Sequence, residues 1–117
     1  MSDIQYIDGG KLFFVGNEKC FAVGSRDVYQ SDINKILSYG NLRKVLFYFV
    51  RFNDVDFSVL NEANIYQFTV LHGNFSRKEL VQICNIPSVK VVQLLDTLVS
   101  VEELNSIKEK YSLIVFK

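Results

Sequence analysis

Apolar and polar residues alternate in short segments over the first 24 residues, and turn residues separate these segments. The two separators are Asp8-Gly9-Gly10 and Gly16-Asn17-Glu18-Lys19, whose glycines supply the positive φ angles of tight hairpins. This pattern is typical of a β-meander. We expect a three-stranded meander over residues 4–24, with strands at 4–7, 12–15 and 20–23.

After Ser25 the spacing of the apolar residues becomes helical. Ser31 can cap a helix that Gly40 ends. Residues 42–50 then carry apolar side chains at i, i+3, i+4, i+7 and i+8, which predicts a central helix. A further helix is predicted over 59–72, although a buried strand in the same segment would give a similar apolar run.

The segment 76–99 has the most distinctive spacing in the chain. Ser76 and Glu79 have the form of a capping box, in which two side chains satisfy free amides at a helix start. Pro87 stops this helix, and a second helix would run over 88–99 with apolar residues on one face. The segment therefore predicts a helix-turn-helix.

This helix-turn-helix resembles that of the winged-helix superfamily. The resemblance leaves residues 101–110 open, because Ser100 and Glu103 repeat the capping-box form whereas a wing hairpin would also fit there. We see no internal repeat. The resemblance implies one winged-helix-like α+β domain over 1–117, with the N-terminal meander, a helical part over 31–99 and a C-terminal strand over 111–116 that adds to the meander.

Charge and hydropathy narrow the classes of partner. Thirteen basic and thirteen acidic residues cancel, so no overall field draws the chain to phosphate backbones or anionic membranes. The longest apolar run, Val45–Val50, is far shorter than the roughly 20 residues of a membrane-spanning helix. The N-terminal residues MSDIQYID have no secretory-signal pattern. We expect a soluble, cytoplasmic protein without a membrane partner.

Few residues offer catalytic or metal-binding chemistry. Cys20 and Cys84 are far apart in the sequence, and His72 is the only histidine. Neither a zinc site nor a disulfide framework follows from this set. The glycines form no phosphate-binding loop. We therefore predict a non-enzymatic protein without metal or cofactor.

The resemblance implies DNA binding in transcriptional control. A recognition helix presents polar side chains to base edges, and basic residues beside it hold phosphates. The basic footprint here is thin, because Lys90 is the only cation on the second helix. The residues predicted to contact bases are Ser88, Lys90, Gln93 and Thr97, and those predicted to contact phosphates are Arg77 and Lys78.

Protein or peptide recognition is the alternative. The predicted architecture is also similar to winged-helix modules that capture a leader peptide by adding it as a strand to a sheet edge. A homodimer formed through aromatic or β surfaces is a third form of this alternative. Neutral charge suits these hypotheses better than it suits DNA. The side chains predicted for a partner surface are Tyr6, Phe13, Phe14 and Phe21.

Overall fold

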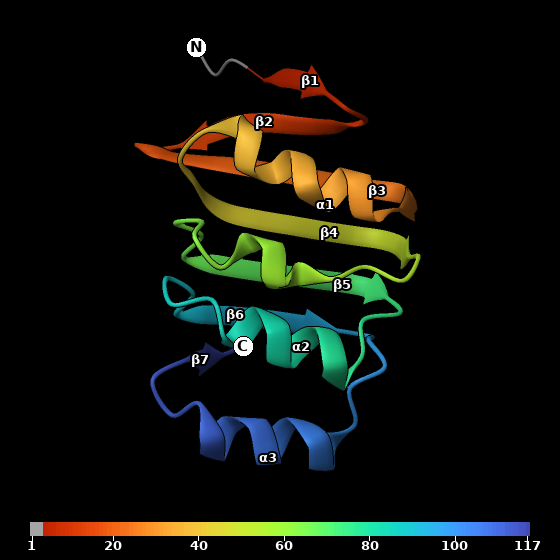
Figure 1. Ribbon diagram of the computed structural model, residues 1–117, viewed down its shortest axis with the longest axis vertical. Helices are drawn as coiled ribbons and strands as arrows, with labels where there is room; N and C mark the ends of the chain where they lie inside the picture. Colours follow the sequence, from red (N-terminus) through yellow and green to blue (C-terminus); the bar gives the residue numbers. More distant parts are fainter. Residues whose placement is uncertain (1–3) are drawn as a thin grey trace.

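A seven-stranded sheet, with its strands in the order of the sequence, forms the frame of the protein (Figure 1). The structure is a computed structural model, and it describes residues 4–117. The strands are β1 (Gln5–Ile7), β2 (Gly10–Val15), β3 (Glu18–Val28), β4 (Leu42–Phe52), β5 (Gln67–Gly73), β6 (Val91–Leu95) and β7 (Val115–Phe116). The helices are α1 (Gln30–Ile36), α2 (Arg77–Cys84) and α3 (Val101–Lys110), with short 3₁₀ helices η1 (Leu37–Tyr39) and η2 (Phe57–Leu60).

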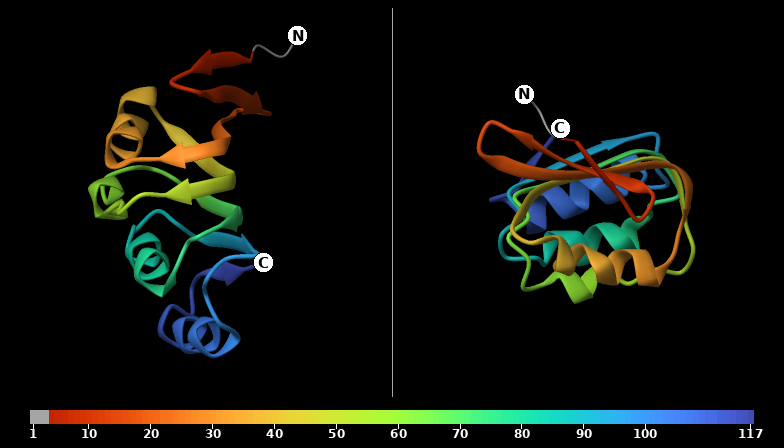
Figure 2. Two further views of the ribbon diagram at one scale, coloured as in Figure 1. Left: turned by 90° about the vertical axis from the view of Figure 1, so that its right-hand side faces the viewer. Right: turned by 90° about the horizontal axis from the view of Figure 1, so that it is seen from above.

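The sheet has an antiparallel beginning and a parallel remainder. β1, β2 and β3 pair antiparallel, whereas β3 to β7 are all parallel neighbours. Each parallel strand returns to the next through a helical segment, and all these segments lie on the same face of the sheet (Figure 2). The chain is thus a one-sided β/α solenoid that starts with a β-hairpin.

The register of the strands reveals an internal repeat. Phe21, Val45, Phe68 and Val92 are aligned across β3 to β6 and are 24, 23 and 24 residues apart. The expectation of no internal repeat was therefore wrong. A repeat of one strand and one helical segment is the building unit of solenoids, in which stacked repeats share a continuous core.

A left-handed residue lies at the same level within β3, β4 and β5, and another directly follows β6. Ser25, Phe49, His72 and Asp96 have φ angles of 57°, 52°, 59° and 55°. We call these four residues the bulge ladder. In β4, Phe47 and Phe52 both enter the core although they are five residues apart, a spacing that strict alternation would place on opposite faces. The extra left-handed residue restores the inward direction, as a β-bulge does.

Phenylalanine rings fill the space between the sheet and the helical segments. The ring centroids of neighbours in this cluster are 5.2–6.3 Å apart, a range in which tilted and edge-on aromatic pairs attract. Burial of this cluster against the sheet holds the helical segments on one face. Its members are Phe47, Phe52, Phe57, Phe68 and Phe75.

The predicted fold class was wrong, because the N-terminal antiparallel strands continue into a parallel sheet with helical segments between its strands, and not into a helical bundle. The predicted central helix over 42–50 is strand β4, and the helix over 59–72 is replaced by η2 and β5. The second helix of the helix-turn-helix is a loop followed by β6. The physical reason is that buried parallel strands read as nearly continuous apolar runs, which satisfy helical spacing by chance.

Local signals were more reliable than long-range ones. The strands of the meander are present, although β3 is longer than predicted. Ser76 and Ser100 begin α2 and α3 with the predicted capping boxes, so residues 101–110 are a helix and not a wing. The C-terminal strand is shorter than predicted, and it pairs with β6 at the edge opposite the meander. α1 begins after Tyr29, with Asp32 closing the capping box, and not at Ser31.

No helix within residues 4–117 is both long enough and apolar enough to cross a membrane.

Candidate binding surface

Within residues 4–117, one face of the sheet carries no helix, and we call it the uncovered face (Figure 2). Side chains alternate along a strand, so the residues between the core positions point to this face. Register aligns them across β2 to β6. They are Lys11, Phe13, Val15, Cys20, Ala22, Gly24, Lys44, Leu46, Tyr48, Gln67, Thr69, Leu71, Val91, Gln93 and Leu95.

A mainly apolar hollow of about 260 Å³ lies in the middle of the uncovered face. Phe13 and Val15 line it from β2, Leu46 from β4 and Leu71 from β5. Cys20 forms part of its wall, and burial raises the pKa of this thiol. The hollow therefore presents a mainly apolar surface that spans β2 to β6, with Lys44 and a few neutral polar groups in its wall.

The Tyr48 ring lies flat against the centre of the uncovered face. A Cβ atom added at Gly24 would lie 2.1 Å from the Tyr48 ring, so the ring occupies the space above this glycine. The ring thus lies across β3 instead of standing away from the sheet. The absent side chain of Gly24 therefore gives the face a flat centre.

Charged side chains on this face form pairs toward the two ends of the strands. Near the amino ends, Lys44 Nζ lies 3.5 Å from Glu18 Oε1. Near the carboxyl ends, Arg51 Nε lies 3.5 Å from Asp27 Oδ1. The side chains between these pairs on β3 to β6 are apolar, hydroxyl or amide groups. This arrangement has the apolar centre and polar rim of a protein interface.

The bulge ladder extends the surface at the carboxyl ends of the strands. The rings of Phe49 and His72 stack with centroids 4.5 Å apart and planes at 17°, and Phe49 is exposed. Asp96 Oδ2 lies 2.9 Å from His72 Nδ1. The His72 side chain therefore lies between the Phe49 ring and the Asp96 carboxylate, near the carboxyl end of β5.

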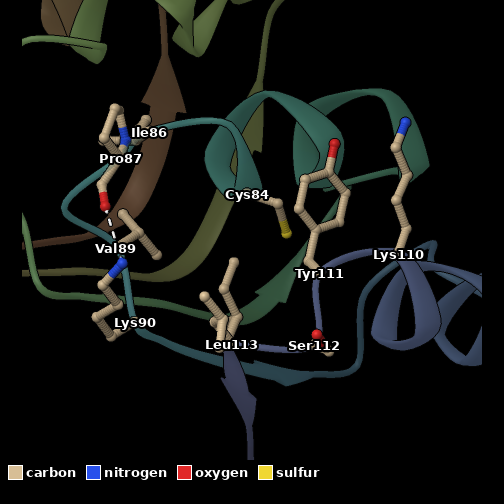
Figure 3. A pocket seen from close by; sticks show the side chains of 10 residues that line it. Cys84, Ile86, Pro87, Val89, Lys90, Lys110, Tyr111, Ser112 and Leu113 are labelled. Carbon is tan, nitrogen blue, oxygen red and sulfur yellow. Dashed lines mark hydrogen bonds between the residues drawn. The ribbon is translucent and has the colours of Figure 1, made fainter.

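A second cavity of about 300 Å³ lies between the ends of α2 and α3 (Figure 3). Cys84 points toward it, and burial raises the pKa of this thiol to about 12. Tyr111 closes one side by donating a hydrogen bond to Asn85 Oδ1 at 2.9 Å. A protonated thiol in an apolar wall is a packing group and not a nucleophile.

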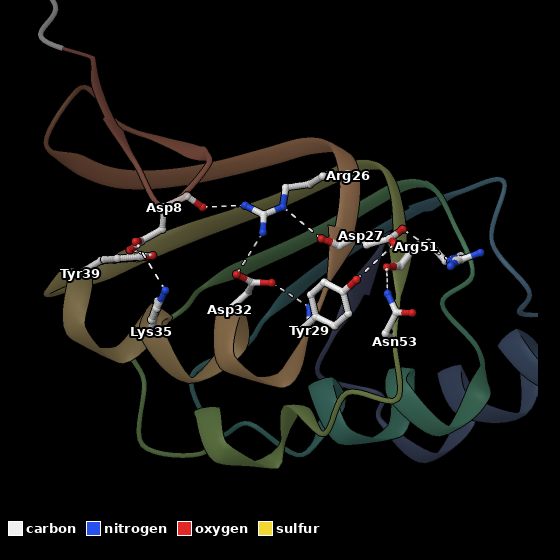
Figure 4. A network of polar contacts seen from close by, with 9 residues as sticks. All are labelled: Asp8, Arg26, Asp27, Tyr29, Asp32, Lys35, Tyr39, Arg51 and Asn53. Carbon is white, nitrogen blue, oxygen red and sulfur yellow. Dashed lines mark hydrogen bonds and ion pairs between the residues drawn. The ribbon is translucent and has the colours of Figure 1, made fainter.

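A polar network fastens the β1–β2 turn to α1 and its neighbours (Figure 4). Tyr39 donates a hydrogen bond of 2.6 Å to Asp8 Oδ2, and this bond is the main reason that the pKa of Asp8 is lowered. Arg26 donates from one nitrogen to the Asp8 carbonyl at 2.7 Å and from another to Asp32 at 3.3 Å. Burial raises the pKa of Tyr39. Each polar group in the network has a hydrogen-bond partner within it, so its role is structural. We call Asp8, Arg26, Asp32 and Tyr39 the clasp.

The residues predicted to contact DNA do not share one helix or one face. Arg77 and Lys78 are exposed at the start of α2. Ser88 donates hydrogen bonds to the carbonyls of Ala63 and Ile65 at 2.9 and 2.7 Å. The other three are placed as follows: Lys90 in the loop before β6, Gln93 on the uncovered face and Thr97 after β6.

The residues predicted for a partner surface are also separated. Tyr6 is exposed on β1, which is the true N-terminal edge of the sheet. Phe13 lines the hollow on the uncovered face, whereas Phe14 is exposed on the opposite side of β2. Phe21 is 5% exposed in the core. The sequence interpretation missed Leu46, Leu71 and Leu95. The repeat of 23–24 residues aligns Leu71 with Leu95, and Leu46 with Thr69.

Within residues 4–117, no cluster of histidine, cysteine and acidic residues has the arrangement of a metal site. Comparison of the chain with protein-family models, curated proteins and solved structures found no match. The candidate function therefore depends on the geometry of this chain alone.

Proposed function

We propose that the protein is a non-enzymatic recognition module that binds a protein partner through the uncovered face. One observation carries the proposal: four neighbouring parallel pairs form a sheet with helices on only one side. Parallel sheets in proteins normally have both faces covered. A partner would supply the missing layer over the apolar hollow.

DNA binding receives less support from the same surface. The residues that motivated it are dispersed, and two of the cations of the uncovered face, Lys44 and Arg51, are paired with carboxylates, whereas Lys11 is a third. Affinity for a duplex depends mainly on phosphate contacts from unpaired basic groups. We therefore expect no salt-dependent binding of random duplex DNA between about 50 and 200 mM salt. Steeply salt-dependent binding would instead favour a nucleic-acid ligand.

Site-specific photo-cross-linking tests the recognition function. A photoreactive amino acid replaces Leu95, which is 56% exposed on the uncovered face, in cells that produce the chain. The matched control replaces Leu37, which is 47% exposed on the helical side. We expect discrete protein adducts from position 95 and none from position 37. Equal adduct patterns, or adducts from position 37 alone, would contradict the proposal.

A further inference from the structure

We propose that the partner of the uncovered face is a second copy of this chain, so that two sheets pack face to face in a homodimer. The inference rests on the proposed recognition function and names its partner. Three properties of the uncovered face favour this partner: the paired backbone at its centre, the absence of charge at its centre on β3 to β6, and its size.

The backbone at the centre of the uncovered face has few free groups for an extended peptide. β3, β4 and β5 have a hydrogen-bonded neighbour on both sides, whereas β2 pairs with β1 only over Gly10–Leu12 and β6 pairs with β7 only at Val91 and Val92. The amide and carbonyl groups at the centre of the face are therefore occupied within the sheet. A peptide laid over the hollow would bury its own amides and carbonyls against side chains, without partners for them. A folded surface has no such cost because its backbone is already paired. The hollow therefore suits a sheet or helix better than a peptide.

The charges of the uncovered face allow a second copy to approach. At the rim, Asp27 pairs with Arg51, and Glu18 lies near both Lys44 and Arg43. The centre between these contacts carries no charged side chain on β3 to β6. The whole chain is also neutral, with thirteen residues of each sign. Two identical surfaces repel when they share one sign of charge. That obstacle is small here, because the centre of the face is uncharged and the rim cations Lys44 and Arg51 lie beside carboxylates.

The molecule is large enough for a stable interface on this side. Its longest two dimensions, 42 and 27 Å, bound the side on which the uncovered face lies. A standard interface needs about 800 Å² from each partner. Two sheets can pack face to face when side chains of the two inner faces interdigitate. Leu46 and Leu71 would then fill the partner's hollow around the flat ring of Tyr48.

Sedimentation over a concentration series tests the inference with the purified chain. We expect a species of twice the 13.5 kDa chain mass at high micromolar concentration. Leu95→Glu places a charge on an exposed position of the uncovered face and should raise the dimer dissociation constant at least 100-fold. The matched variant Leu37→Glu on the helical side should leave the constant within twofold of the original value. Circular dichroism establishes that both variants fold.

Two further outcomes would overturn the homodimer. The chain would remain a monomer at every concentration, or the dimer would be disrupted by Leu113→Glu beside the β7 edge and not by Leu95→Glu. A monomer that still gives cross-linked adducts of other masses from position 95 would leave the recognition function standing and name a different folded protein as partner. Isotope-filtered NMR on a mixed sample offers an independent readout, with intermolecular contacts expected between Leu46 and Leu71 methyl groups.

Discussion

The two faces of the sheet are formed by the same strands, but helical segments cover only one of them. On the helical face, Phe47, Phe57 and Phe68 are fully buried beneath helical segments. On the uncovered face, equally apolar positions such as Leu46 and Leu71 remain half-buried around a hollow. The difference teaches that apolar character alone does not tell which side of a strand belongs to the core of one chain.

Removal of one strand phenylalanine from each face gives the largest expected contrast. Phe68→Ala empties a fully buried position and should lower the free energy of unfolding by about 3–5 kcal/mol. Phe13→Ala on the uncovered face should cost about 1 kcal/mol, because much of that ring already contacts solvent. Urea unfolding at low micromolar concentration, where a dimer dissociates, measures both. Equal costs would mean that the two faces do not differ as described.

Crowding at Gly24 tests the packing of the uncovered face itself. Gly24→Ala places a Cβ atom against the Tyr48 ring and should destabilise the fold by about 1–3 kcal/mol. In a chain that also carries Tyr48→Ala, the added methyl group finds space and should cost much less. A double-mutant cycle from unfolding curves measures this coupling. Additive costs would show that the ring does not lie above Gly24.

The signals that could be read from the sequence were local. Ser76 with Glu79 and Ser100 with Glu103 each mark a helix start within four residues, and both helices begin there. The glycine turns of the first two hairpins are equally local. Pairing of parallel strands is decided by residues more than 20 positions apart, so no window of helical length contains the information. Helical spacing therefore led to the wrong elements at 42–50 and 88–99.

The repeat was present in the sequence as a different pattern. Val45, Phe47 and Phe52 occupy i, i+2 and i+7, and Phe68, Val70 and Phe75 repeat that spacing 23 residues later. A search at this interval would predict the aligned strands and the bulge between the second and third positions. It would not predict which face is left uncovered, because apolar residues lie on both faces of the strands. Of the four predicted partner residues, Phe13 and the buried Phe21 line the hollow.

The bulge ladder is what allows residues on either side of it to enter the same core. Ser25 takes part with a φ of 57°, a conformation in which a β-branched side chain is strained. Ser25→Val should therefore destabilise the fold by about 1–2 kcal/mol, whereas Ser25→Gly should leave it unchanged or stabilise it by up to about 1 kcal/mol. Thermal unfolding of the two variants measures the difference. Equal stabilities would place Ser25 outside the left-handed region.

The clasp at the N-terminal end of the helical face gives the smallest effect, and the effect depends on pH. The Tyr39 hydroxyl, and then Lys35, favour the charged form of Asp8 and hold its pKa below the ordinary 3.8. A carboxyl group with a lowered pKa in the folded state stabilises the fold above its unfolded pKa. That contribution is lost as the pH falls from about 4 through the lower folded pKa.

Asp8→Asn should accordingly flatten the fall in stability below about pH 4 and leave the curve shape near neutrality unchanged. Tyr39→Phe removes the hydroxyl donor and should flatten the same region of the curve. Asp54→Asn is the matched control, because Asp54 is also an exposed aspartate with a positive φ. Urea unfolding from pH 2.5 to 7 measures the three curves. Equal flattening of the acid limb by Asp54→Asn and Asp8→Asn would mean that the loss of any one carboxylate has this effect. The contact between Asp8 and Tyr39 would then make no specific contribution to stability at acid pH.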